Sequence, residues 1–405
     1  MGLIHDIPIP DETVCPNRWI WRAMKWPLLL AWVVLAMATS AQAAEPIRIG
    51  VSLGLTGTYS GPAKMQERGY RLWEQDIKRR GGILGRPVKI VIQDDKSDKG
   101  EAKKIYRDLI TRQRVDLVFG PYSSEITVAV APILEELGYP TLLPGAAADR
   151  IWQQGYNNVF GLFILASKYA LEMIRLAVLH DLRRVAIVYA DDEFSVEVAN
   201  GAKKWARRAN REVVVFEKFK KGIRDLQYLA LKAKEARAEL IVVAGHFDES
   251  VDMRRALKSV GWYPRAYFAT IGPTLQKYGD MMKQDAEFTF AVSLWEPDES
   301  LEFPGSQGFI KAFKNAYKIL PSYHAANAYA AGQVIEAAIT NAGSLDRGKI
   351  RQALYDLDVH VAIGRFRVDR FGVPIKHRPL IIQWLGGKKE IVWPEEHRTA
   401  KPVFR

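Results

Sequence analysis

Short β-rich runs alternate with amphipathic helical stretches along most of the chain, and this alternation limits the possible folds more than any other feature of the sequence. Segments that follow one another in this way are typical of βαβ units, whose strands lie parallel in one sheet. The predicted strands are residues 47–53, 88–92, 115–119, 140–143, 185–189, 213–216, 240–243 and 266–269. The predicted helices are residues 62–80, 102–109, 126–137, 166–180, 196–208, 226–236 and 253–259. The sequence therefore predicts an α/β fold.

The start of the chain carries the pattern of an export signal. Lys25 provides the basic start, residues 26–37 form the apolar region, and Ala41-Gln42-Ala43 has the small residues of a signal-peptidase cleavage motif. We therefore expect cleavage before Ala44. The apolar run is shorter than the roughly 20 residues that a membrane-spanning helix needs, which disfavours a retained anchor. We therefore expect a mature chain that is soluble and lies outside the cytoplasm.

The 23 residues ahead of Met24 contain acidic residues and prolines, unlike a basic signal-peptide start. They suggest that translation begins at Met24, and an unusually long leader is the alternative. The only cysteine, Cys15, lies in this discarded part and not at the cleavage point, so we expect no lipid anchor. The mature chain is then expected to form no disulfide, thiolate metal site or cysteine nucleophile.

The predicted elements form two successive series, and the chain length agrees with two lobes. Removing the leader from 405 residues leaves about 360, which suits two domains of ordinary size better than one core. We therefore predict two doubly wound parallel-sheet lobes. The later elements no longer alternate regularly between strand and helix, and we expect them to complete both lobes. They are helices 303–319 and 325–342, and strands 364–368 and 380–384.

The net charge of +12 does not indicate nucleic-acid binding. The basic residues are dispersed in short clusters that read as helix ends or turns, and no base-stacking set or recognised reading motif accompanies them. A solvated basic surface is the simpler interpretation. A preference for small anionic ligands is left open.

The glycine-rich turn at residues 54–61 follows a strand and opens a helix, where a phosphate loop would lie. It lacks the Lys-Ser or Lys-Thr of a P-loop and the glycine spacing of a dinucleotide fingerprint, so we predict no nucleotide cofactor. The turn is either a tight connection that requires glycine or a ligand contact. In the second case Thr56 and Ser60 offer hydroxyl groups to a small solute.

Two further loops follow predicted strands. Residues 120–124 lie between a strand and a helix, where Ser123 or Ser124 either caps the helix or, with its free N–H groups, binds an anionic group. Residues 144–148 lie at the equivalent end of the next strand, and their small side chains would let a ligand approach the backbone.

Taken in order, the sequence resembles the periplasmic leucine/isoleucine/valine-binding protein family, the solute receptors of ABC importers. The resemblance covers essentially the whole mature chain and is carried by Gly-Thr-Tyr-Ser-Gly-Pro at 57–62, Gly-Gly-Ile-Leu-Gly-Arg-Pro-Val at 81–88, Asp94-Asp95, Gly-Pro-Tyr-Ser-Ser at 120–124, Leu-Pro-Gly-Ala at 143–146, Ser-Val-Gly-Trp at 259–262 and Ile363-Gly364.

This resemblance implies a type I periplasmic binding protein, with two lobes joined by three crossover segments and a ligand in the cleft. It implies residues 44–163 plus 296–360 for the N-terminal lobe and 164–295 plus 361–405 for the C-terminal lobe, after a leader at 1–43. It also implies a periplasmic, monomeric receptor without cofactor, catalytic residue or metal, whose partner is an ABC permease with its cytoplasmic ATPase.

Position by position, the resemblance implies a carboxylate ligand. Ser124 matches the family's serine that bonds the ligand carboxylate, and Ala146 matches a backbone contact. Ala147 or Ala148 lies where amino-acid binders have a threonine, Phe194 where they have a tyrosine, and His246 near another aromatic contact. The predicted ligand-binding set is Thr56, Tyr59, Ser60, Tyr122, Ser123, Ser124, Gly145, Ala146, Ala147, Phe194, His246 and Thr270.

The acid that pairs with a ligand's ammonium group in the family would lie near Thr270, where this chain has no carboxylate. A buried ammonium without a partner costs several kcal/mol, which disfavours a plain α-amino acid. Asp248 or Glu249 is a possible substitute from a neighbouring loop. The alternative is a solute without an amino group: an aromatic or aliphatic acid, or an amide-like compound.

Each of these residues also has a purely structural interpretation. His246 has no metal-ligand partner at a recognised spacing and fits a hydrogen-bonded loop residue equally well. The acidic residues at 191–193 favour helix capping over acid–base catalysis or calcium binding. The rings of Tyr59, Tyr122 and Trp295 fit either the core or the rim of a cleft.

Three functions follow, and the first is favoured: a non-catalytic solute receptor, the same receptor coupled to a sensor, or an exported hydrolase. The hydrolase would need an activated nucleophile, yet the sequence has no Gly-x-Ser-x-Gly elbow, zinc-binding pair or catalytic cysteine. The identity of the solute is left open.

Overall fold

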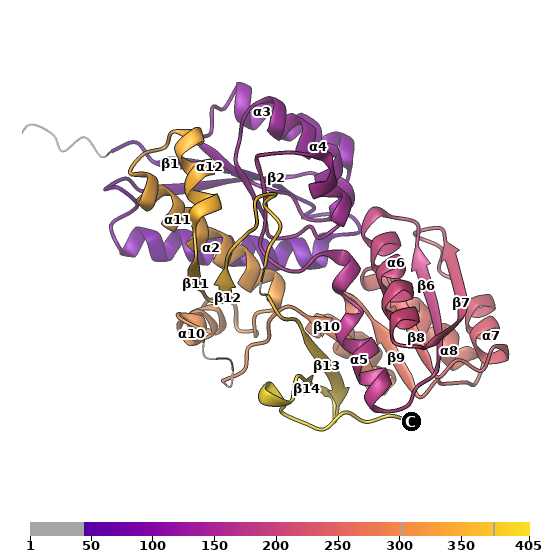
Figure 1. The fold of residues 1–405 in the computed structure, drawn as a ribbon. Coiled ribbons are helices and arrows are strands. Elements are labelled where there is room, and N and C mark those ends of the chain that lie inside the picture. Colours follow the sequence, from indigo (N-terminus) through magenta and orange to yellow (C-terminus); the bar gives the residue numbers. More distant parts are fainter. Residues whose placement is uncertain (1–43, 300, 302, 376) are drawn as a thin grey trace, which may run out of the picture. The chain divides into compact units, whose positions relative to one another are not determined.

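The computed structural model describes residues 44–299, 301, 303–375 and 377–405 (Figure 1). The predicted leader, cleavage point, alternative start and Cys15 lie outside the described residues. Within the described part, none of the helices has the length and apolar character required to cross a bilayer.

The first sheet has five parallel strands in the order β2-β1-β3-β4-β5 in the described part of the chain. They are β1 (Ile47–Leu53), β2 (Val88–Asp94), β3 (Leu117–Phe119), β4 (Thr141–Leu143) and β5 (Val159–Gly161). The helices between the first four strands are α2 (Ser60–Arg79), α3 (Lys99–Thr111) and α4 (Ser124–Glu136). This is the first predicted lobe, with one short strand, β5, that the sequence did not reveal.

The second sheet has seven strands in the order β14-β13-β10-β9-β8-β6-β7 within the described residues. They are β6 (Arg184–Ala190), β7 (Glu212–Phe219), β8 (Leu240–Ala244), β9 (Ala266–Ala269), β10 (Thr289–Ser293), β13 (Leu380–Leu385) and β14 (Lys388–Trp393). The associated helices are α5 (Leu171–Leu179), α6 (Glu193–Arg208), α7 (Gln227–Glu235), α8 (Phe247–Ser259) and α9 (Gln276–Met282).

Only part of the second sheet is parallel, so the predicted parallel sheet is incomplete. Strands β6 to β10 run parallel, whereas β13 pairs antiparallel with β10 and with β14. The β13–β14 hairpin forms because Gly386 and Gly387 adopt φ of 60° and 78°, the left-handed pair of a tight hairpin turn. A late hairpin therefore extends this sheet.

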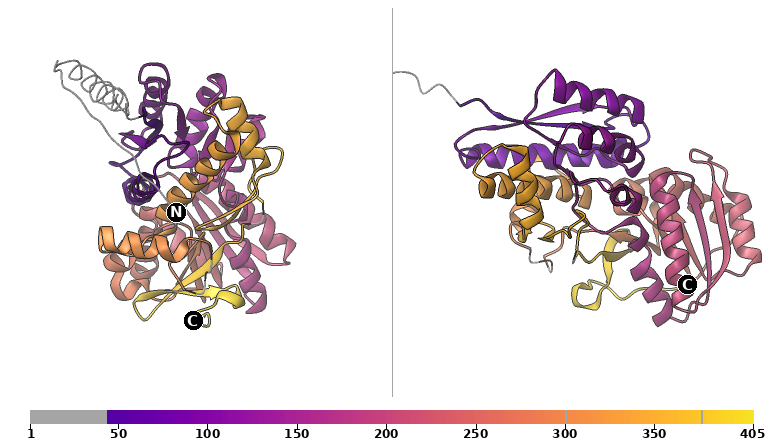
Figure 2. Two further views of the ribbon diagram at one scale, coloured as in Figure 1. Left: turned by 90° about the vertical axis from the view of Figure 1, so that its left-hand side faces the viewer. Right: turned by 45° about the horizontal axis from the view of Figure 1, so that its top comes forward.

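Helices cover both faces of the second sheet, as Figures 1 and 2 show. The alternation of side chains along β6 explains this arrangement. Val185 and Ile187 belong to the same apolar cluster as Val198 of α6, whereas Ala186 and Val188 belong to the cluster of the α7 residue Leu229. Because both faces are covered, these strands read as continuous apolar runs.

The late helices pack against the first sheet layer. They are α10 (Ser306–Tyr317), α11 (Tyr323–Ala342) and α12 (Arg347–Asp356), and α11 lies along α2 (Figure 1). The two helix backbones come close because Gly69 of α2 faces the Ala325 carbonyl of α11: a Cβ at Gly69 would lie 2.1 Å from that oxygen.

The predicted strand at 364–368 forms a separate ribbon and joins neither main sheet. It is β12 (Gly364–Phe366), which pairs only with β11 (Val359–Val361) among the described strands. Beyond the ribbon, the Gly372 carbonyl accepts a hydrogen bond from the N–H of Gly161 in the first sheet, N···O 2.9 Å. We therefore propose that the C-terminal lobe resumes at β13, later than the predicted boundary at 361.

We predict that Gly69→Ala destabilises the protein, because the added methyl group has no room between α2 and α11. Overpacking of this kind costs about 1–3 kcal/mol of unfolding free energy. The control is Gly308→Ala on the exposed face of α10, where a Cβ meets nothing within 4 Å. Urea unfolding should show a loss for Gly69→Ala and a small gain for the control; equal effects would contradict the close approach.

Candidate ligand-binding site

One small cavity lies where strands of both sheets end. It follows the carboxyl ends of β3, β4, β5, β6, β8 and β9, the edge at which doubly wound sheets bind ligands. Its volume is about 20 Å³, room for about one water molecule. It is lined by Tyr122, Ser123, Ser124, Pro144, Gly145, Ala147, Phe163, Tyr169, Phe194, His246, Ile271, Tyr323 and His324.

Two adjacent serines at the start of α4 have different roles. Ser123 is the N-cap, at φ 86°, and its Oγ accepts a hydrogen bond from the Ile126 N–H at 3.2 Å. Ser124 instead reaches the loop after β4, where its Oγ accepts from the N–H groups of Ala147 and Ala148, both at 3.0 Å. Ser123 therefore caps the helix, Ser124 ties the start of α4 to the loop after β4, and both serines line the cavity.

The hydroxyl of Ser124 is set as a donor toward the cavity. A serine oxygen has two acceptor positions and one O–H. Both acceptor positions are used by Ala147 and Ala148, and the O–H has no acceptor among the described residues. The O–H of Ser124 is therefore available to a group that accepts a hydrogen bond, such as a carboxylate.

The loop after β4 is fixed by polar side chains from two helices. The Pro144 carbonyl accepts from Gln66 Nε2 at 3.0 Å and from Asn327 Nδ2 at 3.4 Å. Gly145 is required in this loop because a Cβ there would lie 3.0 Å from the Tyr122 Cα and 2.8 Å from Gln66 Nε2. The backbone of the loop thus packs directly against Tyr122.

Aromatic rings make up most of the cavity wall. Phe194 packs edge to face against Tyr169 with ring centroids 5.0 Å apart and contacts His246 at 5.4 Å. Tyr323 stacks on His324 at 4.0 Å. None of the described lining residues is Asp, Glu, Lys or Arg. The wall therefore suits a flat apolar body with one polar end.

His324 contributes a neutral imidazole. Burial lowers the pKa of His324 to about 3, and the charges of His246 and Lys389 act in the same direction. Its Nε2 lies 3.4 Å from the Tyr122 hydroxyl, and its Nδ1 has no hydrogen-bond partner within the described chain.

His246 faces the cavity beside the buried carboxylate of Asp192. Asp192 caps α6, accepting from the N–H groups of Phe194 and Ser195 at 3.1 Å each and from the Ser195 hydroxyl at 2.7 Å. Burial opposes its ionisation, but His246, Ser195 and Lys221 outweigh burial and hold the pKa of Asp192 below its usual range. The capping interpretation of residues 191–193 is confirmed for Asp192.

Seven of the twelve predicted binding residues line the cavity: Tyr122, Ser123, Ser124, Gly145, Ala147, Phe194 and His246. Tyr59 lies beside it, with its ring 5.0 Å from that of His246. Thr56 is exposed and bonds Asp94, Ser60 begins α2, and Ala146 belongs to the apolar cluster of Trp152. These last three are outside the lining set.

Thr270 and the suggested acidic substitutes are also turned away from the cavity. The Thr270 hydroxyl accepts from the Gly245 N–H and donates to the Gly245 carbonyl, which uses it within the loop. Asp248 is half exposed and pairs with Arg224 at 3.5 Å. Glu249 accepts the His246 backbone N–H at 2.9 Å and does not line the cavity.

The predicted binding set omitted six lining residues, of which Pro144 belongs to a loop that the sequence did indicate: Pro144, Phe163, Tyr169, Ile271, Tyr323 and His324. Tyr323 and His324 open α11, about 200 residues beyond the serines, and reach the cavity only because α11 packs on α2. Trp295, a predicted aromatic candidate, is buried elsewhere and donates to the Ser306 hydroxyl at 3.3 Å.

A cluster of charges beside the cavity joins the two sheet layers. Lys221, in the loop after β7, donates to the Tyr59 hydroxyl and to Glu125 of α4, with Nζ···Oε2 at 3.1 Å. Lys99 of α3 pairs with the same carboxylate at 3.6 Å. Burial opposes ionisation of Glu125, but the charge and hydrogen bond of Lys221 outweigh it, and the pKa of Glu125 is lowered. We call Lys221, Tyr59 and Glu125 the rim cluster.

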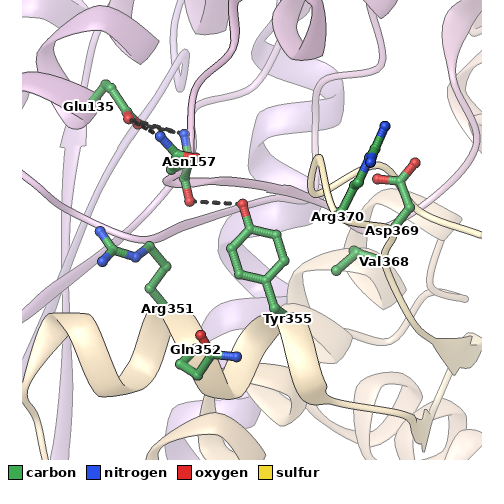
Figure 3. Close-up of a pocket in the computed structure, with 8 residues that line it drawn as sticks. All are labelled: Glu135, Asn157, Arg351, Gln352, Tyr355, Val368, Asp369 and Arg370. Carbon is green, nitrogen blue, oxygen red and sulfur yellow. Dashed lines mark hydrogen bonds between the residues drawn. The ribbon is translucent and has the colours of Figure 1, made fainter.

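A larger pocket of about 520 Å³ lies near α12 and is shown in Figure 3. Three of its lining residues bond to one another: the Glu135 carboxylate accepts from Asn157, and the Tyr355 hydroxyl donates to the Asn157 carbonyl at 3.1 Å. Gln352 and Arg370 are exposed. No cluster of metal-ligating residues occurs in the described ranges. The small aromatic cavity therefore remains the best candidate site.

Residues 46–387 match a family of sequences described as "Periplasmic binding protein". The chain belongs to this family. This confirms the family recognised from the sequence, whose curated relatives include "Leu/Ile/Val-binding protein homolog 7" of Brucella melitensis biotype 1, 26% identical over 90% of this chain and 96% of the relative.

Two solved structures in the same group support the fold. A leucine binding protein from Thermotoga maritima superposes with a TM-score of 0.79 at 22% identity, covering 85% of this chain and 97% of that one. A solute binding protein from R. palustris, solved in complex with benzoate, has a TM-score of 0.77 at 20% identity, covering 88% of this chain and 98% of that one. The predicted two-lobed, type I binding protein fold is confirmed.

We predict that Lys221→Met favours separation of the lobes in the ligand-free protein. It removes the cation that links Glu125 and Tyr59 to the second sheet layer, so the radius of gyration from X-ray scattering should increase. Lys99→Met is a matched control, because it removes a Glu125 partner that lies within the first layer. Equal scattering from both variants would contradict a linking role for the rim cluster.

Proposed function

We propose that the chain is the solute-binding receptor of an ABC importer of the branched-chain-amino-acid type, and that its solute is a small carboxylic acid without an ammonium group. The observation that carries the proposal is the composition of the cavity wall. It offers the Ser124 O–H to an acceptor and aromatic rings to an apolar body, and none of its described lining residues is acidic.

The lack of a carboxylate among the described lining residues argues against a zwitterionic amino acid. The nearby acids are already engaged: Asp192 caps α6, Glu249 accepts a backbone N–H, and Glu125 pairs with Lys221. A ligand ammonium in this cavity would lose its hydration without a dedicated partner, at a cost of several kcal/mol. An aromatic acid avoids that cost and matches the ring-rich wall. Among structural relatives, the R. palustris protein was solved with benzoate.

Ligand entry requires the lobes to separate. The cavity of about 20 Å³ is far smaller than a benzoate-sized solute, and its lining comes from both sheet layers. We infer that open and closed forms interconvert and that the acid stabilises a closed form by touching both layers. The closed form would then dock on the permease, whose cytoplasmic ATPase drives import. Export to the periplasm by cleavage before Ala44, and a monomeric state, belong to the same proposal.

A receptor is also favoured over a hydrolase by the state of Ser124. A serine nucleophile needs a base within hydrogen-bond reach. Ser124 Oγ is bonded to two backbone N–H groups, and among the described residues no histidine bonds to it. We therefore expect bound acids to be recovered unchanged.

The proposal is tested by a thermal-shift screen of the mature chain against benzoate-type acids, aliphatic acids, short dicarboxylates, amides, leucine and isoleucine. A matching acid at 100 times its Kd should add about 2.7 kcal/mol of stability and reduce the radius of gyration. Benzoate-type acids should stabilise more than leucine. Stabilisation by leucine alone would overturn the proposed ligand class, and chemical conversion of a hit would overturn the receptor.

We predict that Ser124→Ala weakens binding of benzoate by about 1.5–3 kcal/mol, the contribution of a hydrogen bond to a charged group. The same change leaves the N–H groups of Ala147 and Ala148 without their acceptor, so unfolding must be measured alongside calorimetric binding. Ser60→Ala is the control, because Ser60 was a predicted contact that lies outside the cavity lining. Unchanged affinity in the folded Ser124→Ala protein would refute the carboxylate contact.

A further inference from the structure

A second helix besides α4 begins at the cavity wall. It is α11, and Tyr323 and His324 of its first turn line the cavity. Ser322 occupies the N-cap position, but its hydroxyl accepts no backbone N–H and has no hydrogen-bond partner among the described residues. The first N–H groups of a helix lack intrahelical partners and carry partial positive charge. The start of α11 therefore favours a negative group beside it.

His324 adds a polar side chain with an unused nitrogen to the same wall. It is 1% exposed, and its Nδ1 has no hydrogen-bond partner in the described part of the chain. The other nitrogen, Nε2, lies 3.4 Å from the Tyr122 hydroxyl, and Tyr323 stacks on the ring with centroids 4.0 Å apart. A buried polar atom without a partner is costly, so a ligand that pairs with Nδ1 removes that cost.

The Tyr122–His324 pair holds one more hydrogen than it uses. Burial lowers the pKa of His324 to about 3, so the imidazole is neutral and carries one N–H. Burial raises the pKa of Tyr122 well above its usual value, so the phenol keeps its O–H. The bond between the two side chains uses one of these hydrogens, and the Tyr122 hydroxyl has no other partner among the described residues. One donor of the pair is therefore left without an acceptor, whichever way the bond runs.

The acid–base chemistry of the two groups determines the direction of their bond. An imidazole nitrogen is a much stronger base than a phenol oxygen, so the favoured arrangement has the Tyr122 O–H donating to Nε2 of His324. The tautomer of a neutral histidine is set by the bond that one of its nitrogens makes. Nδ1 then carries the hydrogen, and the unused group of the pair is an N–H donor.

Ser124 supplies a matching donor from the start of α4. Both helices belong to the first sheet layer, because α4 connects β3 with β4 and α11 packs along α2. The described lining residues include no Lys or Arg, so the donors available to an anion are neutral. A carboxylate offers an acceptor oxygen to each of two donors, and two helix starts provide favourable potential for its charge.

We propose that the ligand carboxylate is bound by the Ser124 O–H and by the Nδ1–H of His324, and that Tyr122 is the positioning residue that holds His324 in this tautomer. The inference rests on the proposed function and deepens it, because it names both contacts of the acid group. It also gives a basis for specificity. A carboxylate accepts at both oxygens, whereas a primary amide has one acceptor oxygen and turns an NH2 group toward the other donor, which stays unpaired.

The first experiment compares benzoate with benzamide by isothermal titration calorimetry of the mature chain. His324→Leu should weaken benzoate binding about 10- to 100-fold, the loss expected for a hydrogen bond to a charged group, and should weaken benzamide binding much less. The benzoate-to-benzamide affinity ratio therefore falls about tenfold, a coupling between ligand and residue that general damage to the site does not produce. An unchanged ratio in folded His324→Leu would overturn the inference while leaving the receptor intact.

Two further variants serve as controls for this comparison. His377→Leu removes another histidine whose pKa is lowered by burial, to about 4, but which lies outside the cavity lining, so it should leave the ratio unchanged. His324→Asn keeps an N–H donor near the position of Nδ1 and should bind benzoate more tightly than His324→Leu. Benzoate binding to folded His324→Asn that is no tighter than to His324→Leu would count against the donor role.

The second experiment measures the tautomer by nitrogen-15 NMR of the histidine side chains. In the wild-type protein His324 should carry its hydrogen on Nδ1 and should not titrate between pH 5.5 and 8.5, and the Nδ1 resonance should shift when benzoate binds. Tyr122→Phe should weaken benzoate binding and lower the fraction of the Nδ1–H tautomer, which a packing role alone would not change. A hydrogen on Nε2 in the wild type would overturn the inference. Failure of every acid in the screen to bind the wild type would instead overturn the proposed function, and the inference with it.

Discussion

The candidate site depends on the two hydrogen bonds that the Ser124 hydroxyl accepts from the N–H groups of Ala147 and Ala148. These bonds tie the start of α4 to the loop after β4, so that two loops from neighbouring strands form one wall. Gly145 allows the same loop to lie directly on Tyr122, and Gln66 holds it from the other side. Because both acceptor positions of the serine oxygen are used, the structural role of Ser124 also determines its chemical role: its remaining group is a donor.

The hydrogen bonds already made around the cavity also explain which solutes the site can accept. Acids near the cavity are engaged in capping or ion pairs, whereas the Ser124 O–H is left over at its wall. A cavity whose free groups donate hydrogen bonds selects an acceptor, and it penalises a ligand that leaves those groups unpaired. Selection of a carboxylic acid over an amino acid therefore depends on the residues that line the cavity and also on the residues that pack against them.

The sequence predicted most of the architecture because parallel strands covered on both faces give unmistakable apolar runs; residues 47–53 and 266–269 were placed with their observed bounds. Short or late elements such as β5, β10 and β14 were missed, since three to six residues carry little periodicity. The loops at strand ends were predicted because topology places them at one edge. Tyr323 and His324 were not, because their approach depends on how α11 packs on α2. Thr270 lies outside the lining set, because its hydroxyl is used by the Gly245 backbone.

The contacts between the two layers divide into a strong centre and a weak rim. The side chains of Lys221 and Glu125 are 23% and 26% exposed, and ion pairs with this much access to water contribute about 1 kcal/mol or less. A contact of that size changes the ratio of closed to open forms about fivefold at most. A ligand at 100 times its Kd contributes about 2.7 kcal/mol, a factor near 100. The rim cluster can therefore orient the two sheet layers in the closed form, but its contribution is too small to maintain that form. The ligand in the aromatic cavity must provide most of the stabilisation.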